Sequence, residues 1–280
     1  MDLIDLHVHS TSSDGTLTPE EIAIHAKEIG LKAIALTDHD TINGVEDCLN
    51  KGNEIGLKVI PGIECATEFN GKSLHILGYG IDIYSDKFKT KLNSVAKERK
   101  ERNLKMLDKL DKLDIHLSTQ DLEEDTPKGT TITRSHFASA MLRKGYISTR
   151  NEAFTKYIGD TGPAYVPREN FTVSDCINMI HDAGGVAVLA HPMLYGYSRS
   201  EVTDLIRILK DFGLDGVETL YTTHTPQDTN HLLQVCDTLN LFPTGGSDFH
   251  GGNKPGTKLG FGHGGLKISS KILDDFTIDV

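Results

Sequence analysis

The sequence predicts an α/β protein built as a (β/α) barrel that is interrupted by a mainly helical insertion. Short apolar strands alternate with helices along most of the chain. At least five of these strands deliver a histidine or a carboxylate, and a closed ring easily brings that many strand ends to one point. An open doubly wound sheet has the same alternation and stays the alternative, although no GxGxxG or P-loop sequence is present.

The first predicted strand carries two histidines on one face. In the stretch Asp5-Leu6-His7-Val8-His9-Ser10, alternate side chains point to opposite faces. His7 and His9 therefore share a face that could chelate a metal, while Leu6 and Val8 point to the core.

The first predicted helix has clear end signals. Thr18 is suited to be its N-cap, Pro19 occupies the first helical position, and Glu21 closes a capping box. We expect this helix to run to about Ile29 and to end at Gly30.

The alternation then continues through the rest of the barrel. Further strands are expected at 32–37, 58–63, 73–78, 185–190, 216–220 and 241–244. Further barrel helices are expected at 45–55, 173–183, 199–212 and 226–239.

The insertion is predicted to contain a long charged helix over 86–114 and shorter helices at 119–125, 134–144 and 149–158. We therefore expect a barrel domain of residues 1–83 and 171–280 and an insertion domain of residues 84–170. The insertion holds 17 Lys and Arg against 13 Asp and Glu, whereas the remainder holds 12 against 27. The acidic barrel could hold cations and the basic insertion could face an anion, although charged helices are often simply solvated.

Composition indicates a soluble cytoplasmic protein without a membrane partner. Its 280 residues can bury a sizeable core, and its four cysteines lack CxxC spacing, so we expect them to be reduced, buried, apolar residues. No basic start followed by an apolar run and no stretch of about 20 apolar residues is present.

Nine residues are candidate metal ligands, and nearly all of them lie at the end of an apolar run. They are His7, His9, Asp14, His39, Glu64, His75, His191, Asp248 and His250. Imidazoles and carboxylates without thiolates suit manganese, iron or zinc, and Glu64 could bridge two ions. Because nine ligands exceed the need of one ion, we expect two or three divalent ions. Such a centre suits phosphate ester hydrolysis by a metal-activated hydroxide, with amide or lactone hydrolysis as alternatives.

Two further stretches are candidates for substrate binding. Arg134, Ser135 and His136 stand at an expected helix start, which favours contact with a phosphate. His224 lies just past a strand end and is a second candidate for substrate contact. The glycine-rich stretch 251–256 is expected to be a turn, and the alternative is a mobile loop over the site that brings Lys254 near a phosphate.

These motifs together resemble the PHP (polymerase and histidinol phosphatase) family of metal-dependent phosphoesterases. The resemblance rests on His7-Val8-His9, Thr37-Asp38-His39-Asp40, Gly62-Ile63-Glu64, His75-Ile76-Leu77-Gly78, Ala190-His191-Pro192 and Gly246-Ser247-Asp248-Phe249-His250. It implies a distorted (β/α)7 PHP barrel with a trinuclear metal centre. It implies one ion held by His7, His9, Glu64 and Asp248, a second held by Glu64, His75 and His191, and a third held by Asp14, His39 and His250.

Within the family, the chain resembles the branch of nucleoside 3',5'-bisphosphate phosphatases and 5'-to-3' exoribonucleases. This implies that the insertion caps the carboxyl-terminal face of the barrel and that Arg134 and His136 bind a substrate phosphate. The expected reaction is removal of the 3'-phosphate from a nucleoside 3',5'-bisphosphate, with manganese as the first choice of metal and iron or zinc as alternatives. The candidate catalytic residues are His191, His224 and Asp248.

Three other functions remain open from the sequence. They are a 5'-to-3' exoribonuclease on short 5'-phosphorylated RNA, a histidinol phosphate phosphatase, and a non-catalytic metal-binding PHP module. The acidic barrel and the absence of an extended basic stripe make binding of duplex DNA unexpected. The sequence carries no prediction of an oligomeric state.

Overall fold

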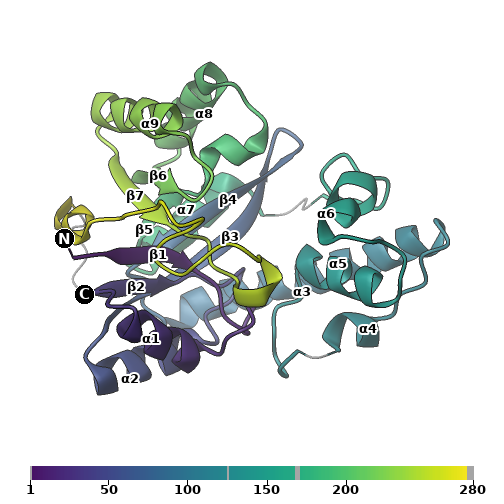
Figure 1. The fold of residues 1–280 in the computed structure, drawn as a ribbon. Coiled ribbons are helices and arrows are strands. Elements are labelled where there is room, and N and C mark those ends of the chain that lie inside the picture. Colours follow the sequence, from purple (N-terminus) through teal and green to yellow (C-terminus); the bar gives the residue numbers. More distant parts are fainter. Residues whose placement is uncertain (1, 125, 168–170, 276–280) are drawn as a thin grey trace.

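Seven strands form one sheet in sequential order, from β1 to β7 (Figure 1). The computed structural model of the protein describes residues 2–124, 126–167 and 171–275. The strands are β1 (Ile4–Val8), β2 (Ala33–Leu36), β3 (Lys58–Phe69), β4 (Lys72–Tyr79), β5 (Val186–Leu189), β6 (Gly216–Tyr221) and β7 (Phe242–Gly246). All neighbouring pairs are parallel except the two pairs that include β4.

Backbone contacts between the first and last strands nearly close the sheet into a barrel. The His9 amide donates to the Phe249 carbonyl at 2.9 Å. The buried Asp5 carboxylate on β1 accepts hydrogen bonds from the Ser247 and Gly260 amides. The predicted barrel is therefore confirmed, and the open sheet is not formed.

The antiparallel strand β4 is a departure from simple strand and helix alternation. The expected strand over 58–63 continues to Phe69, because its second half pairs with β4 through a hairpin turn at Asn70 and Gly71. Both turn residues have positive φ, as tight hairpins require. Glu64 is thus in the middle of β3 and not at its end. Because β4 runs in the opposite direction, its beginning reaches the face where the parallel strands end.

Helices follow the strands in the expected places. In the barrel they are α1 (Pro19–Glu28), α2 (Val45–Ile55), α7 (Val173–Asp182), α8 (Arg199–Asp211) and α9 (Pro226–Leu239). Thr18 caps α1 through the predicted capping box with Glu21. Short 3-10 turns occur at η2 (Pro192–Tyr195), η3 (Gly251–Asn253) and η4 (Ser270–Asp275).

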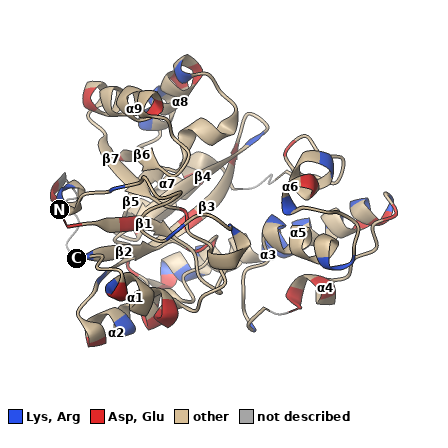
Figure 2. Cartoon of the chain, viewed as in Figure 1, with Lys and Arg blue, Asp and Glu red and all other residues tan. Residues whose placement is uncertain are grey.

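The helices of the insertion are α3 (Asp86–Asp111), α4 (Thr119–Glu123), α5 (Arg134–Arg143) and α6 (Arg150–Ala153), which a π-helical turn, η1 (Phe154–Ile158), extends. We call residues 84–170 the cap. The cap helices lie to one side of the barrel, and α3 leads from the barrel into them (Figure 1). Lys and Arg mark both ends of α5 and the start of α6, acidic residues mark α4, and the barrel helices carry residues of both signs (Figure 2).

The apolar core has three parts. One cluster fills the barrel and includes Leu6, Leu77 and Val188, and a larger cluster lies between the sheet and its helices. A separate cluster in the cap includes Phe137 and Met141. The division into two domains remains a prediction.

The cysteines and the helices agree with the composition. All four cysteines are buried and free, as expected. Among the described residues, no helix combines the length and the apolar character that a bilayer crossing needs.

Candidate metal centre and adjoining cavity

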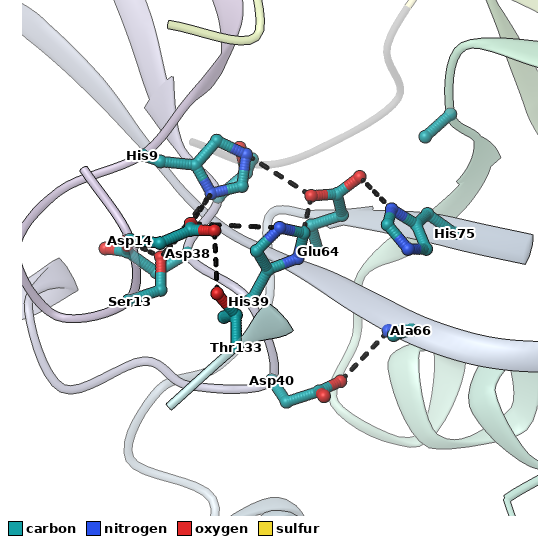
Figure 3. Close-up of polar contacts among 12 residues, drawn as sticks. His9, Ser13, Asp14, Asp38, His39, Asp40, Glu64, Ala66, His75 and Thr133 are labelled. Carbon is teal, nitrogen blue, oxygen red and sulfur yellow. Dashed lines mark hydrogen bonds and ion pairs between the residues drawn. The ribbon is translucent and has the colours of Figure 1, made fainter. Parts of the chain in front are cut away.

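All nine predicted ligands gather at one end of the barrel. They form four overlapping groups, and within each group the ligand atoms lie within 4.8 Å of one another. The groups are His9, Asp14, His39 and His250; His7, His191 and Asp248; His7, His9 and Glu64; and His39, Glu64 and His75. The overlap shows that the donors form one continuous cluster, part of which appears in Figure 3.

His7 and His9 direct their Nε2 atoms to the same two carboxylates. The His7 Nε2 lies 3.3 Å from Glu64 Oε2 and 3.7 Å from Asp248 Oδ1. The corresponding distances from His9 Nε2 are 3.2 and 3.4 Å. The alternation of β1 therefore places both imidazoles on one face, as predicted.

Asp14, His39 and His250 form a second part of the cluster. Asp14 Oδ1 lies 3.2 Å from His250 Nε2 and 3.8 Å from His39 Nε2. The same oxygen is 3.9 Å from His9 Nδ1. His39 also directs its Nδ1 to Glu64 Oε2 at 3.0 Å, so its ring lies between the Asp14 and Glu64 carboxylates (Figure 3).

The third part of the cluster surrounds the other oxygen of Glu64. His75 Nδ1 lies 2.8 Å from Glu64 Oε1, and His191 Nε2 lies 3.0 Å from it. His75 reaches this point because β4 is antiparallel, so a residue near the beginning of the strand comes to the ligand end of the barrel. Glu64 thus faces imidazoles with both oxygens, which suits a bridging role.

The donor set suits divalent cations. His7 Nε2, His9 Nε2 and His39 Nδ1 are buried around Glu64 Oε2 at 3.0 to 3.3 Å, yet none of these four atoms forms a hydrogen bond. Buried polar atoms without hydrogen bonds are costly, and imidazole lone pairs and carboxylates are the ligands that such cations use. Manganese, iron and zinc would all accept these ligands.

The His7 ring is oriented from its far side by Glu218. Its Nδ1 lies 3.0 Å from Glu218 Oε1, and a carboxylate only accepts, so Nδ1 carries a proton and Nε2 would supply the lone pair to a cation. Burial by itself would lower the pKa of His7, but Glu218 and Glu64 outweigh it and raise that pKa well above its usual range, so a cation would replace the proton on Nε2. His250 is held in a similar way, because its Nδ1 lies 2.9 Å from the Asp248 carbonyl oxygen. Such contacts fix the ring orientation of metal-binding histidines.

The electrostatics of the cluster favour positive charge. Burial by itself would raise the pKa of Glu64, but the imidazoles of His39 and His7 outweigh it and hold that pKa well below the usual range. Burial lowers the pKa of His75 to about 4, so this ring is neutral at pH 7. The carboxylates are therefore ionised, and a bound cation would compensate them.

Three residues of the ligand loops have positive φ values. Asp40, His191 and Asp248 have φ angles of 51°, 27° and 56°. Such conformations are uncommon for residues other than glycine, and they gather at functional sites where the surrounding structure enforces them. The surrounding structure therefore holds the backbone of His191 and Asp248 in strained conformations, and these conformations direct their side chains into the cluster.

Several supporting residues were not predicted from the sequence. Glu218 on β6 is completely buried and accepts from the His191 amide at 2.7 Å besides contacting His7. Asp38 accepts from the hydroxyls of Ser10 and Ser13 and so holds the loop that carries Asp14. A carboxylate within the otherwise apolar strand 216–220 was the available signal for Glu218.

Asp248 is held on its second oxygen. Its Oδ2 accepts hydrogen bonds from the Tyr221 hydroxyl at 2.6 Å and from the Lys254 ammonium. Lys254 belongs to the glycine-rich turn, so this turn, expected to be only a connection, also contacts a candidate ligand. Oδ1 of Asp248 stays directed to His7 and His9.

A cavity adjoins the cluster on the cap side. The candidate ligands Asp14, His39 and His75 line it, and so do Arg99, Arg102 and Arg134 from the cap. Ser135 and Tyr165 also line it. The guanidinium carbons of Arg102 and Arg134 lie 5.6 and 5.4 Å from the centroid of the Tyr165 ring.

The arginines of this cavity have partners within the protein. Arg99 forms a buried ion pair with Asp40, through Nε at 2.9 Å and through Nη2. Arg134 Nη1 donates to Asp160 at 2.6 Å. A guanidinium carries five donor hydrogens, so Arg134 retains further donors for an anion.

Two predicted substrate residues stand apart from the lining of this cavity. Over the described residues, the lining includes Arg134 and Ser135 but neither His136 nor His224. The buried His136 accepts at Nδ1 from the Thr133 amide at 3.0 Å, as part of the capping box of α5. His224 Nδ1 lies 3.0 Å from the Thr219 carbonyl oxygen, and its Nε2 is buried without a hydrogen-bond partner.

Comparison with known proteins identifies the family. The PHP domain model matches residues 5–150. A 5'-3' exoribonuclease of Haemophilus influenzae is 35% identical over 88% of this chain and 89% of its own length. A 3',5'-nucleoside bisphosphate phosphatase of Chromobacterium violaceum is 30% identical over 92% of this chain and 90% of its own length.

Comparison with solved structures relates the fold to the same kind of enzyme. A solved structure described as a metal-dependent phosphoesterase, from Bifidobacterium adolescentis, superposes with a TM-score of 0.85 at 28% identity. It covers 98% of this chain, and the match covers 95% of that structure. The chain therefore belongs to the PHP domain family and is a metal-dependent phosphoesterase.

Proposed function

We propose that the protein removes the 3'-phosphate from a nucleoside 3',5'-bisphosphate. One observation carries this proposal: a single cavity has candidate metal ligands on one wall and three arginines on the other. A bisphosphate needs both walls, because one phosphate must react at the metals while the other is held by positive charge. The Chromobacterium relative is named for this substrate class.

The arrangement of the cap wall favours a nucleotide over a smaller phosphate ester. The Tyr165 ring has the guanidinium groups of Arg102 and Arg134 at 5.6 and 5.4 Å from its centroid, so this wall combines an aromatic surface with positive charge, as a nucleotide requires. Arg134 and Ser135 stand at the beginning of α5, where backbone amides also favour an anion. In this proposal Arg134 and Ser135 bind the phosphate that is retained, and His136 supports them from the capping box.

The proposed ligand sets are those implied by the family. His7, His9, Glu64 and Asp248 would hold one ion, Glu64, His75 and His191 a second, and Asp14, His39 and His250 a third, with manganese as the first choice. When bound, divalent ions supply a nucleophile near neutral pH and stabilise the entering and leaving oxygens of phosphoryl transfer. Asp248 stays ionised for this purpose: burial raises its pKa, but Lys254 and His7 outweigh burial and lower it.

His224 is proposed to orient the reacting groups. Burial lowers its pKa, so the ring is neutral, and its Nδ1 proton is engaged by the Thr219 carbonyl. Its Nε2 is then a hydrogen-bond acceptor, and because it is buried outside the cavity lining, a substrate hydroxyl or water would have to pass that lining to reach it. His191, as a ligand, would orient substrate through the metal and would not act as a free acid.

A second candidate function is 5'-to-3' exonucleolytic cleavage of short RNA. The Haemophilus relative, with 35% identity, is named for this activity. A phosphodiester needs the same metals and the same phosphate site, but it also needs room for the departing strand.

We place the protein in the cytoplasm, which the four free cysteines support.

Two products, inorganic phosphate and released mononucleotides, are measured to test the two functions, because hydrolysis of an RNA phosphodiester releases nucleotides and no free phosphate. The manganese-loaded protein is given adenosine 3',5'-bisphosphate, AMP, histidinol phosphate and a short 5'-phosphorylated RNA, beside an Asp248→Ala variant. Fast release from the bisphosphate that is lost in the variant supports the proposal. Preferred cleavage of the RNA favours the exonuclease, and turnover of histidinol phosphate alone refutes the nucleotide assignment.

A further inference from the structure

We propose that the cap completes the metal site at Asp14, with Thr133 as the positioning residue. The inference rests on the proposed role of Asp14 as a metal ligand, and it does not depend on which substrate is hydrolysed. The cap would then be part of the metal centre and not only a wall for substrate.

The two oxygens of Asp14 face different parts of the protein. Oδ1 faces the imidazoles of His250, His39 and His9 at 3.2 to 3.9 Å. Oδ2 accepts a hydrogen bond from the Thr133 hydroxyl of the cap at 2.9 Å (Figure 3). Both residues are buried. The Thr133 hydroxyl therefore selects which oxygen is presented to a cation and prevents the carboxylate from turning.

Thr133 is itself held in place by the helix that it caps. Its hydroxyl oxygen accepts from the Ser135 amide at 3.1 Å, and its own amide donates to His136 Nδ1. With the oxygen engaged as an acceptor, the hydroxyl proton is directed to Asp14. The beginning of α5 thus fixes a hydrogen bond to a candidate ligand from the other part of the protein.

A second route from the cap reaches the backbone of Asp14. Arg150 on α6 donates through Nη2 to the Asn253 side-chain oxygen at 2.5 Å. The Asn253 side-chain nitrogen in turn donates to the Asp14 carbonyl at 2.8 Å. Asp14 is therefore held at its side chain by Thr133 and at its backbone by Asn253.

The cap segment before Thr133 also lies along the loop that carries Asp14. The Thr130 hydroxyl donates to the Thr11 carbonyl at 2.8 Å, and the Thr131 amide donates to the Ser12 carbonyl at 2.9 Å. These contacts are made to the backbone, so they are independent of a substrate. They place Thr133 reproducibly against Asp14.

The experiment measures metal binding without substrate. The full chain is freed of metal with a chelator and titrated with Mn²⁺ by calorimetry, and bound ions are counted by mass spectrometry. Thr133→Val removes the donor with little change of shape, Thr133→Ser keeps it, and Asn253→Ala removes the second route without altering the α5 cap. Thr172→Val is the matched control, because Thr172 also caps a helix, α7, but its hydroxyl contacts Asp175 and no candidate ligand.

We expect Thr133→Val to weaken one Mn²⁺ site by about 10 to 100-fold, which is the usual effect of removing a hydrogen bond to a ligand. Asn253→Ala should act in the same direction, and Thr133→Ser and Thr172→Val should bind like the unaltered protein. In an Asp14→Ala background, Thr133→Val should cause no further loss, because the pair acts as a unit.

Three results would overturn the proposal. They are unchanged affinity in Thr133→Val, an equal loss in Thr172→Val, or a loss from Thr133→Val that persists without the Asp14 carboxylate. If Asp14→Ala binds all ions as before, the ligand assignment fails together with the proposal. A failure of the nucleotide assignment would instead be seen only in phosphate release, so the two failures are distinguishable.

Discussion

Replacing Glu218 by glutamine should weaken metal binding although Glu218 is not a ligand. Glu218 is buried and satisfies two donors, the His7 ring at 3.0 Å and the His191 amide at 2.7 Å. A glutamine of the same shape has only one acceptor oxygen. The nitrogen of its side-chain amide must therefore face one of the two donors.

Either orientation of the glutamine has a cost that can be estimated. If its nitrogen faces the His191 amide, a buried donor is left without an acceptor, which costs about 1–3 kcal/mol. If its nitrogen faces His7, the ring proton must move to Nε2, the atom that faces Glu64 and Asp248. The first case disturbs the backbone of His191, itself a candidate ligand, and the second removes the lone pair of His7 Nε2. Both therefore predict a loss of Mn²⁺ affinity of about 10 to 100-fold, equal to about 1.4–2.8 kcal/mol.

Calorimetric titration of the metal-free protein with Mn²⁺ measures this loss. The matched control is Glu201→Gln, because Glu201 is exposed in the capping box of α8, where it contacts Ser198 and no candidate ligand. We expect the control to bind Mn²⁺ normally. An affinity of Glu218→Gln within twofold of the unaltered protein would refute the argument that this hydrogen bond sets the His7 ring.

Three further predictions concern protons, stability and metal removal. Burial lowers the pKa of His39, but Glu64 and Asp14 outweigh it and raise that pKa to about 9. Since a ligand nitrogen must lose its proton, Mn²⁺ binding should release protons below pH 9, and the Mn²⁺ affinity should weaken as the pH falls. Calorimetry in buffers of different ionisation enthalpy measures this proton release. Absence of proton release at pH 7 would contradict the prediction. Arg99→Met should lower the free energy of unfolding, measured by urea denaturation, by about 3–5 kcal/mol, because the buried Asp40 carboxylate then lacks its ion-pair partner. The double variant Arg99→Met/Asp40→Asn should recover part of this loss. Mn²⁺ at 100 times its dissociation constant should stabilise the native state by about 2.7 kcal/mol. The melting temperature should therefore rise when Mn²⁺ is added and fall back to its original value when a chelator removes the metal. A melting temperature independent of Mn²⁺ would contradict a metal centre.

The sequence by itself determined the class of fold and the set of donors. Strand and helix periodicity and capping residues such as Thr18 are local signals, so the elements were predicted nearly where they lie. The candidate ligands were also predicted locally, because histidines and carboxylates beside apolar runs are unusual and chemically specific. His7 and His9 needed only the alternation of a strand.

Only the tertiary structure decided how these donors are held. Glu218 acts on His7 across 211 positions of the chain, and Thr133 acts on Asp14 across 119. The antiparallel direction of β4, which brings His75 to the ligand end, depends on pairing with both β3 and β5. A hydrogen bond or a strand direction is a relation between distant segments, and neither partner differs by itself from an ordinary buried or polar residue. The choice of which oxygen of Asp14 faces the imidazoles is therefore made by the packing of the cap against the barrel.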